Sequence, residues 1–161
     1  MTNVVLSLGS NIEPRKEHLD RAVSQIRTWS GKKLRLSNIY ITEPYGYHSE
    51  HEYLNMAVEL GTSLTPQEIM QRISALESEM GRHRTNDRIE DRTIDIDLLF
   101  YGGEIIHEKD LDVPHPRLHQ RNFVLAPLLD IVPDLLHPEL KKPVWELYDA
   151  CKDKSEIRIL E

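Results

Sequence analysis

The stretch that decides the fold begins with Tyr53-Leu54-Asn55-Met56-Ala57-Val58-Glu59-Leu60. Apolar residues alternate along this run, which predicts a strand with one buried face. A helix is predicted directly after it, over residues 65–81. Thr65 and Glu68 match a capping box at its start, and Gly81 suits its end. This strand and helix are the most clearly predicted elements, so the other elements are assigned relative to them.

A second strand follows the helix and reads Ile94-Asp95-Ile96-Asp97-Leu98-Leu99-Phe100-Tyr101. Successive side chains of a strand point to opposite faces. We therefore expect one set of apolar residues to pack against the helices: Ile94, Ile96, Leu98 and Phe100. Asp95 and Asp97 should then point away from the helices.

The same pattern precedes residue 53. A strand is predicted at Val4–Leu8, a helix from Pro14 to Ile26, and a strand over residues 34–42 with a bulge or a break between Leu36 and Ile39. The order is β-α-β-β-α-β. It packs most simply as an α+β fold: a ferredoxin-like antiparallel sheet with both helices on one face. The other face is then where an active site is expected. One domain, residues 1–161, is expected.

The last third of the chain carries weaker signals. Pro114-His115-Pro116 predicts a stiff loop, and Asn122 is expected to cap a short helix. A short helix around Trp145 and a strand over residues 156–160 are expected near the C-terminus.

Composition narrows the class of protein. The net charge is −7, which disfavours nucleic-acid binding. Apolar runs are too short to span a bilayer, so no membrane association is expected. The sequence from Met1 runs straight into a strand, so we expect no signal peptide. Cys151 is the single cysteine, which fits a cytoplasmic location.

Asp95 and Asp97 predict a metal site. Residues i and i+2 on one strand face lie roughly 6.5–7 Å apart. Two carboxylates at that spacing suit Mg²⁺, which keeps its waters and binds phosphate oxygens. The alternative is an ordinary polar face of a two-sided strand, although Asp is disfavoured there.

Arginines gather just before these aspartates, with Arg82, Arg84, Arg88 and Arg92 in eleven residues. Arginine forks bind phosphate oxygens in a bidentate way. Together with a metal they point to phosphoryl transfer from ATP, although no Walker A loop is present. The alternative is a solvated loop of mixed charge.

Tyr53 and Asn55 should share the face of the two aspartates. A tyrosine ring stacks on a flat heterocycle, and an amide pairs with its edge. The alternative for Tyr53 is simple packing at a strand end.

These features resemble the hydroxymethyl-dihydropterin pyrophosphokinase family of folate biosynthesis. The matching pieces run in order from residue 8 to about residue 130. They are Leu8-Gly9-Ser10-Asn11, Tyr40-x-Thr42-x-Pro44-x-Gly46, Tyr53-Leu54-Asn55, Glu77, Gly81-Arg82-x-Arg84, Arg92-Thr93-Ile94-Asp95-Ile96-Asp97, Val113-Pro114-His115 and Arg121-x-Phe123.

The resemblance implies that the pterin hydroxymethyl oxygen attacks the β-phosphorus of ATP, giving AMP and the pterin diphosphate. It implies that Asp95 and Asp97 bind two Mg²⁺ ions and that Arg82 and Arg92 steady the transferred group. The ATP site would be lined by Glu77, Arg84, Leu98, His115 and Arg121. The pterin pocket would be formed by Thr42, Pro44, Tyr45, Tyr53, Asn55 and Phe123, with Tyr53 and Phe123 covering the two ring faces.

One segment departs from the family. Ile89, Glu90 and Asp91 stand where Trp-Gly-Pro is usual. A catalytically weak or re-specified relative, or a ferredoxin-like metabolite-binding module, is therefore kept as an alternative. We expect the loop over residues 82–92 to be mobile without ligands and to close over ATP. We expect a monomer; contact with dihydropteroate synthase is possible, and the sequence does not test it.

Overall fold

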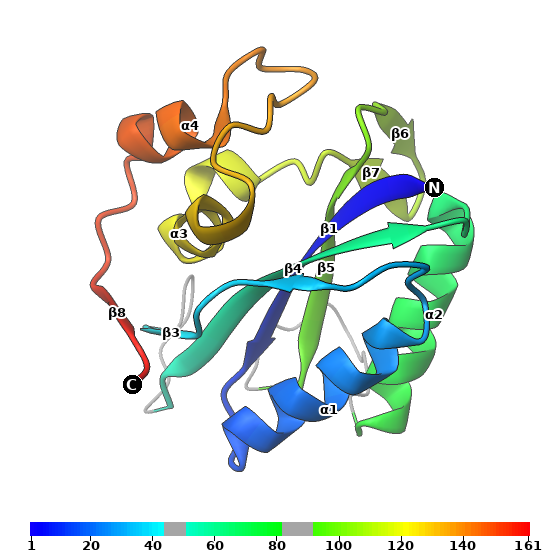
Figure 1. Ribbon diagram of the computed structural model, residues 1–161. Coiled ribbons are helices and arrows are strands. Elements are labelled where there is room, and N and C mark those ends of the chain that lie inside the picture. Colours follow the sequence, from blue (N-terminus) through cyan, green and yellow to red (C-terminus); the bar gives the residue numbers. More distant parts are fainter. Residues whose placement is uncertain (44–50, 82–91) are drawn as a thin grey trace.

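The computed structural model describes residues 1–43, 51–81 and 92–161 (Figure 1). Its main sheet has the strand order β5-β1-β4-β3-β8, with β2 also paired to β4, and every pair is antiparallel. The bounds are β1 Thr2–Ser10, β2 Arg35–Leu36, β3 Tyr40–Thr42, β4 Tyr53–Thr62, β5 Asp95–Tyr101 and β8 Ile157–Ile159. This order confirms the ferredoxin-like β-α-β-β-α-β core.

Two helices cover one face of the sheet, as predicted. They are α1, Arg15–Arg27, and α2, Pro66–Glu79 (Figure 1). The capping box of α2 is formed: the Glu68 amide donates to Thr65 Oγ1 at 3.1 Å, and the Thr65 amide donates to Glu68 Oε1 at 3.0 Å. The larger core lies between these helices and the sheet, and it includes Leu6, Val58 and Ile96.

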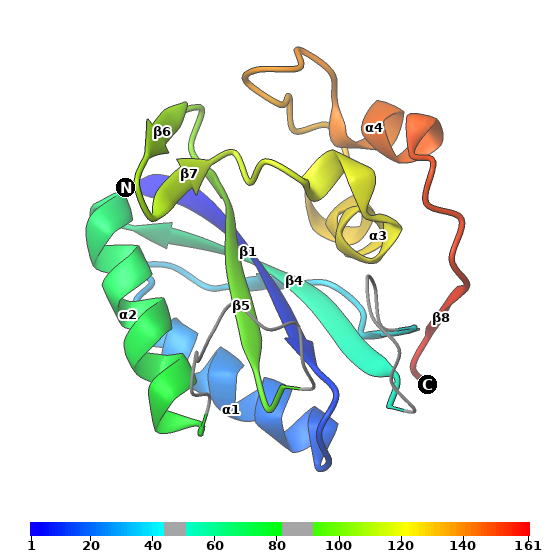
Figure 2. The same ribbon diagram turned by 180° about the vertical axis from the view of Figure 1, so that it is seen from behind.

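The other face is partly covered by two shorter helices, α3, Asn122–Ile131, and α4, Val144–Ala150 (Figures 1 and 2). A second core forms there, in which Leu125 and Leu147 accompany Ala57 of β4. The helices leave the end of the sheet near Gly9 uncovered by this core. That end is where the candidate site lies.

The expected position of Phe100 was wrong. Phe100 belongs to the second core, together with Leu99 and Val5. The register with β1 shifts between Val5, which faces Phe100, and Leu6, which faces Leu98. Leu99 is thus one extra residue in β5, a bulge that turns Phe100 to the α3 side. The bulge lies beyond Asp97, so the aspartates keep their predicted face.

The remaining elements lie around this core. A separate hairpin contains β6, Ile106–Glu108, and β7, Leu111–Val113, and a 3-10 helix η1 spans Leu118–Gln120. Of the bulge or break expected after Leu36, the structure has the break, since β2 and β3 are separate strands. The short helix near Trp145 and the C-terminal strand are also confirmed, as α4 and β8.

Asn122 does not cap α3, contrary to expectation. It is the first residue of the helix, and its side-chain amide donates to the Ser155 carbonyl at 2.7 Å. The residue at the N-cap position is Arg121, whose side chain makes no capping bond. None of the helices in the described ranges is long and apolar enough to cross a membrane.

Candidate active site

Register brings polar residues of three strands together on the second face. Gly9 of β1 lies opposite Asp95 of β5 and opposite Asn55 of β4, and Ser7 lies opposite Asp97. A Cβ atom at Gly9 would lie 2.7 Å from Asn55 Oδ1, which is too close for a side chain. Glycine at this position therefore lets the Asn55 amide approach the central strand.

A cavity of about 190 Å³ opens over this part of the sheet. The side chains around it come from β1, the β3 end, β4, β5 and the segment that leads into α3. They are Ser7, Gly9, Thr42, Glu43, Tyr53, Asn55, Arg92, Asp95, Asp97, Arg117, Arg121 and Phe123. Eight of these were predicted from the sequence as site residues: Thr42, Tyr53, Asn55, Arg92, Asp95, Asp97, Arg121 and Phe123.

The acidic end of the cavity is built on the start of β5. Arg92 Nη1 lies 3.1 Å from Asp95 Oδ1, and both side chains are mostly buried, with 20% and 25% exposed. Asn11 fixes the Arg92 backbone, since the Arg92 amide donates to Asn11 Oδ1 at 2.6 Å and the Asn11 amide donates to the Arg92 carbonyl at 3.0 Å. Arg92 therefore enters the site from a defined backbone position.

The donor set at this end fits Mg²⁺. Asp95 and Asp97 both line the cavity, and carboxylate oxygens are the ligands that Mg²⁺ prefers. Within the described ranges, no group of three or more His, Cys, Asp or Glu side chains could hold a metal. Mg²⁺ is commonly held by one or two carboxylates plus substrate phosphates, so two aspartates are sufficient.

The opposite end carries a buried polar pair. Asn55 Nδ2 donates to Thr42 Oγ1 at 2.5 Å, and the two residues are only 5% and 2% exposed. With Nδ2 engaged by Thr42, Oδ1 is the amide atom on the Gly9 side, at the floor of the cavity. Tyr53 lines the same end. An amide edge beside an aromatic ring suits a flat heterocycle.

The α3 side contributes a second aromatic ring and a cation. The guanidinium carbon of Arg121 lies 5.8 Å from the centroid of the Phe123 ring, within cation–π range. Phe123 lines the cavity from α3, whereas Tyr53 lines it from β4. The cavity thus has aromatic walls from two elements that are far apart in the sequence.

His115 is held neutral near this wall. Burial is the main cause that lowers the pKa of His115 to about 4, and the Arg121 charge lowers it further. Its Nδ1 accepts from the Arg117 amide at 3.1 Å, so the proton of the neutral ring is assigned to Nε2. The ring is therefore a neutral donor at pH 7, close to the charge of Arg121.

Three predicted ATP-site residues do not line the cavity: Glu77, Leu98 and His115. The Glu77 side chain is 2% exposed, and its Oε2 accepts from the Ile96 amide at 2.9 Å. Leu98 packs in the larger core. Four predicted residues, Arg82, Arg84, Pro44 and Tyr45, lie outside the described residues, as does nearly all of the loop expected to close. Their roles stay predictions.

Four residues that line the cavity were not predicted as site residues: Ser7, Gly9, Glu43 and Arg117. Gly9 and Asn11, which fixes Arg92, had been noted only as part of a matching motif. Ser7 and Gly9 alternate with the apolar residues of β1, so strand phase was a usable signal for them. No periodic pattern marks Arg117, which reaches the cavity from the loop before η1.

The sequence model of the 7,8-dihydro-6-hydroxymethylpterin-pyrophosphokinase (HPPK) family matches residues 5–133, well over half of the chain. This chain belongs to the HPPK family. A Porphyromonas gingivalis protein, 2-amino-4-hydroxy-6-hydroxymethyldihydropteridine pyrophosphokinase, is 42% identical over 146 residues, covering 89% of this chain and 99% of that protein. The Pneumocystis carinii Folic acid synthesis protein fol1 is 37% identical over 150 residues, covering 93% of this chain but 20% of that protein.

Solved structures agree on the HPPK fold. The wild-type Plasmodium falciparum HPPK-DHPS structure aligns with a TM-score of 0.75 at 17% identity. The alignment covers 92% of this chain and 44% of that chain, so this chain spans less than half the length of the solved protein. At this identity the likeness shows the fold alone.

HPPK membership confirms the family resemblance seen in the sequence. It supports the pyrophosphokinase hypothesis rather than a metabolite-binding module or a re-specified relative, because the matched relatives carry the pyrophosphokinase name.

Proposed function

We propose that this chain transfers the pyrophosphoryl group of ATP to the hydroxymethyl oxygen of 6-hydroxymethyl-7,8-dihydropterin, a step of folate biosynthesis. One bond forms between that oxygen and the β-phosphorus, and the bond from the β-phosphorus to the α,β-bridging oxygen breaks, so AMP leaves. HPPK membership supports this assignment. The observation that carries it is a single cavity with two aspartates at one end and the Asn55–Thr42 pair at the other.

The Asn55 end is proposed to bind the pterin. Tyr53 and Phe123 line the cavity from opposite elements and would cover the two ring faces. Asn55 and Thr42 would bond the ring edge, because both are buried and already fixed by their mutual hydrogen bond. Pro44 and Tyr45 would complete this pocket.

The aspartate end is proposed to hold the ATP phosphates. Asp95 and Asp97 would hold Mg²⁺, and two ions are expected. When bound, Mg²⁺ offsets the negative charge of the phosphates during transfer. Arg92 and Arg121 line the cavity and would bind phosphate oxygens, and Arg117 belongs to the same set. Arg82 would steady the transferred group, and Arg84 would bind ATP.

Neutral His115 is proposed to donate from Nε2 to ATP, a role that its lowered pKa allows at pH 7. Leu98 can offer ATP only its backbone, because its side chain is in the core. Glu77 would act mainly by fixing β5 through the Ile96 amide. We also propose a monomeric, cytoplasmic protein; contact with dihydropteroate synthase is suggested only by the HPPK-DHPS neighbour.

The test is product identity. Purified protein is incubated with ATP, MgCl₂ and 6-hydroxymethyl-7,8-dihydropterin, and the products are followed by phosphorus NMR. AMP and the pterin diphosphate should appear in equal amounts, and chelation with EDTA should stop their formation. Formation of ADP and a pterin monophosphate, or no turnover at all, would contradict the proposal.

A further inference from the structure

Two site residues depend on how the first turn of α3 is held. Arg121 is the N-cap of α3 and Phe123 is its second residue, and both line the cavity. The first amides of a helix have no partner within the helix. Arg121 cannot supply one, since a guanidinium group only donates hydrogen bonds. A side chain from another part of the chain can accept from this turn.

Asp153 supplies that acceptor from thirty-one residues away. Its Oδ2 accepts from the Asn122 amide at 3.2 Å. Its Oδ1 accepts from the Ser155 amide at 3.0 Å and from Ser155 Oγ at 2.6 Å, which fixes the carboxylate in place. The Asn122 side chain returns a bond to the Ser155 carbonyl at 2.7 Å. A carboxylate beside a helix N-terminus is also favoured by the helix dipole.

The same segment then joins the strand side of the cavity. In β8, Ile157 pairs with Thr42 and Ile159 with Tyr40, and the Leu160 amide donates to the Ile39 carbonyl at 2.8 Å. Figure 2 shows the chain running from α4 alongside α3 to β8. Residues 153–160, the C-terminal strap, therefore connect the α3 wall of the cavity to the β3 wall.

The far end of α3 is fixed independently. Tyr40 Oη donates to the Asp130 carboxylate at 2.9 Å, and the Asn38 amide donates to the same group at 3.0 Å. The second core holds the middle of the helix. Loss of the Asp153 contact should therefore loosen the first turn alone, where Arg121 and Phe123 lie.

We propose that Asp153 is a positioning residue that holds Arg121 and Phe123 at the cavity through the first turn of α3. This inference rests on the proposed function, and it assigns a role to a segment outside the family match, which ends at residue 133. Asp153 touches neither substrate. Its effect is to keep the α3 side of the cavity in a fixed position relative to the β3 side.

The experiment compares Asp153→Ala with Asp149→Ala. Asp149 is an exposed carboxylate on α4 and serves as the matched control. Losing a cap that accepts from a helix amide typically lowers the equilibrium constant for forming that helix turn by about fivefold. We expect Asp153→Ala to raise the KM for both the pterin and ATP by about fivefold with kcat nearly unchanged. Asp149→Ala should match wild type.

A readout that does not depend on turnover keeps this test separate from the proposed function. Hydrogen exchange of the Asn122 and Phe123 amides should quicken in folded Asp153→Ala, with or without turnover. If Asp153→Ala does not fold, Asp153→Asn, which keeps a carbonyl acceptor, should show the same changes in smaller size. Unchanged KM values with unchanged exchange, or a lower Tm with unchanged KM values, would overturn the positioning role. A wild-type protein that forms no AMP would overturn the proposed function instead.

Discussion

The Asn55 amide shows how one residue serves both structure and binding. It is 5% exposed, donates to Thr42, and lies so close to Gly9 of β1 that a Cβ atom there would force it to shift. A buried amide whose partners are removed costs more than the net value of its bonds. Asn55 should therefore be sensitive to change on both counts.

Asn55→Ala should weaken pterin binding by about 1–3 kcal/mol, or roughly 5- to 150-fold in Kd, because the ring edge loses its partner. Calorimetric titration of the pterin into the variant measures this. Asn3→Ala is the control, since Asn3 is an exposed asparagine on the same sheet that bonds Lys32. Equal Kd values for the two variants would contradict the assignment of Asn55 to the pterin pocket.

His115 predicts a pH dependence of stability. Its folded pKa, about 4, lies below the ordinary value of 6.5. Between these values the unfolded chain binds a proton that the folded chain does not, so stability should fall as the pH drops from about 6.5 to about 4. The loss should reach at most about 3 kcal/mol. Urea unfolding of His115→Gln should show a smaller loss than wild type over this range.

The contrasting variant is His107→Gln. The protonated His107 ring donates hydrogen bonds to Asp112 and to Glu139, which raises the pKa of His107. Its contribution to stability is therefore complete below the unfolded pKa and disappears as the pH rises. His107→Gln should therefore lose stability mainly at low pH, opposite in sign to His115→Gln. The same pH slope in both variants would contradict the assignments.

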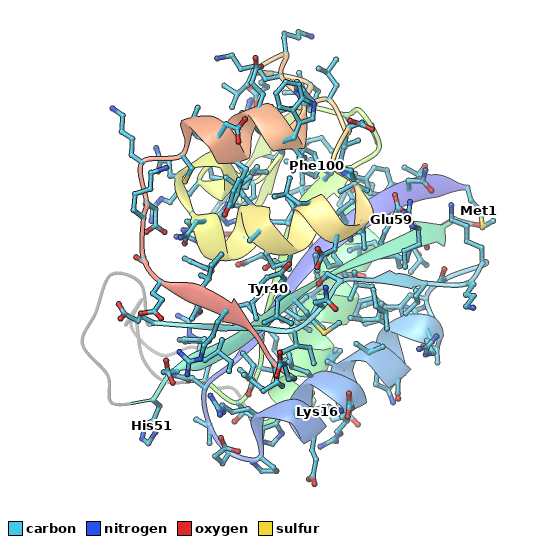
Figure 3. The ribbon with its side chains drawn as sticks, turned by 60° about the vertical axis from the view of Figure 1, so that its left-hand side comes forward. Met1, Lys16, Tyr40, His51, Glu59 and Phe100 are labelled. Atoms are coloured by element: carbon cyan, nitrogen blue, oxygen red, sulfur yellow. The ribbon has the colours of Figure 1, made fainter. Side chains whose placement is uncertain are left out.

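Among the elements, α3 brings the second aromatic ring to the cavity. It packs across β4 and β3 and brings Phe123 to the cavity from the side opposite Tyr53. Tyr40 anchors it at the far end, where Figure 3 shows the labelled Tyr40 on the strands below the helix. Desolvation and the Asp130 carboxylate raise the pKa of Tyr40 to about 12, so the hydroxyl stays protonated as a donor.

Tyr40→Phe should destabilise the fold by about 1–2 kcal/mol, because Asp130 loses its side-chain donor. Urea unfolding at pH 7 measures the change, and Tyr148→Phe on α4 removes a hydroxyl as control. The difference between wild type and Tyr40→Phe should shrink above pH about 10, since ionisation then favours the unfolded chain. Equal stability of Tyr40→Phe and Tyr148→Phe would show that this bond does not hold α3.

The elements also mark the limit of reading strands by alternation. The period of two placed Asp95 and Asp97 on the correct face but failed at Phe100. One extra residue at Leu99 changes the phase, and that bulge arises from pairing with β1, which alternation within β5 does not contain. Local pattern is sufficient until a neighbouring strand changes the register.

Over the whole molecule, local signals predicted the α+β core. The capping box at Thr65, the helix predicted from Pro14 to Ile26 and the interruption after Leu36 all depend on neighbouring residues, and all are present. Local signals alone were not sufficient to predict the site residues. Asn55, Asp95 and Asp97 were predicted because strand phase and family resemblance agreed, whereas Thr42 was predicted from the resemblance alone.

The predictions that failed concerned residues whose contacts are far away in the sequence. Asn122 looked like a cap, yet the acceptor for its own amide is Asp153, far along the chain. Arg117 was missed because its approach to the cavity depends on how the loop before η1 folds back on the sheet. Such contacts are set by tertiary packing, so a sequence pattern cannot report them.

The central claim is that Asp95 and Asp97 form the centre of a pyrophosphoryl-transfer site, and its most direct test is the rate of AMP formation by Asp97→Asn. The substitution keeps shape but removes the charge that would hold Mg²⁺. AMP formation should fall by about 100-fold or more with Tm nearly unchanged, and Asp149→Asn should match wild type. An Asp97→Asn protein that forms AMP at the wild-type rate would contradict the account.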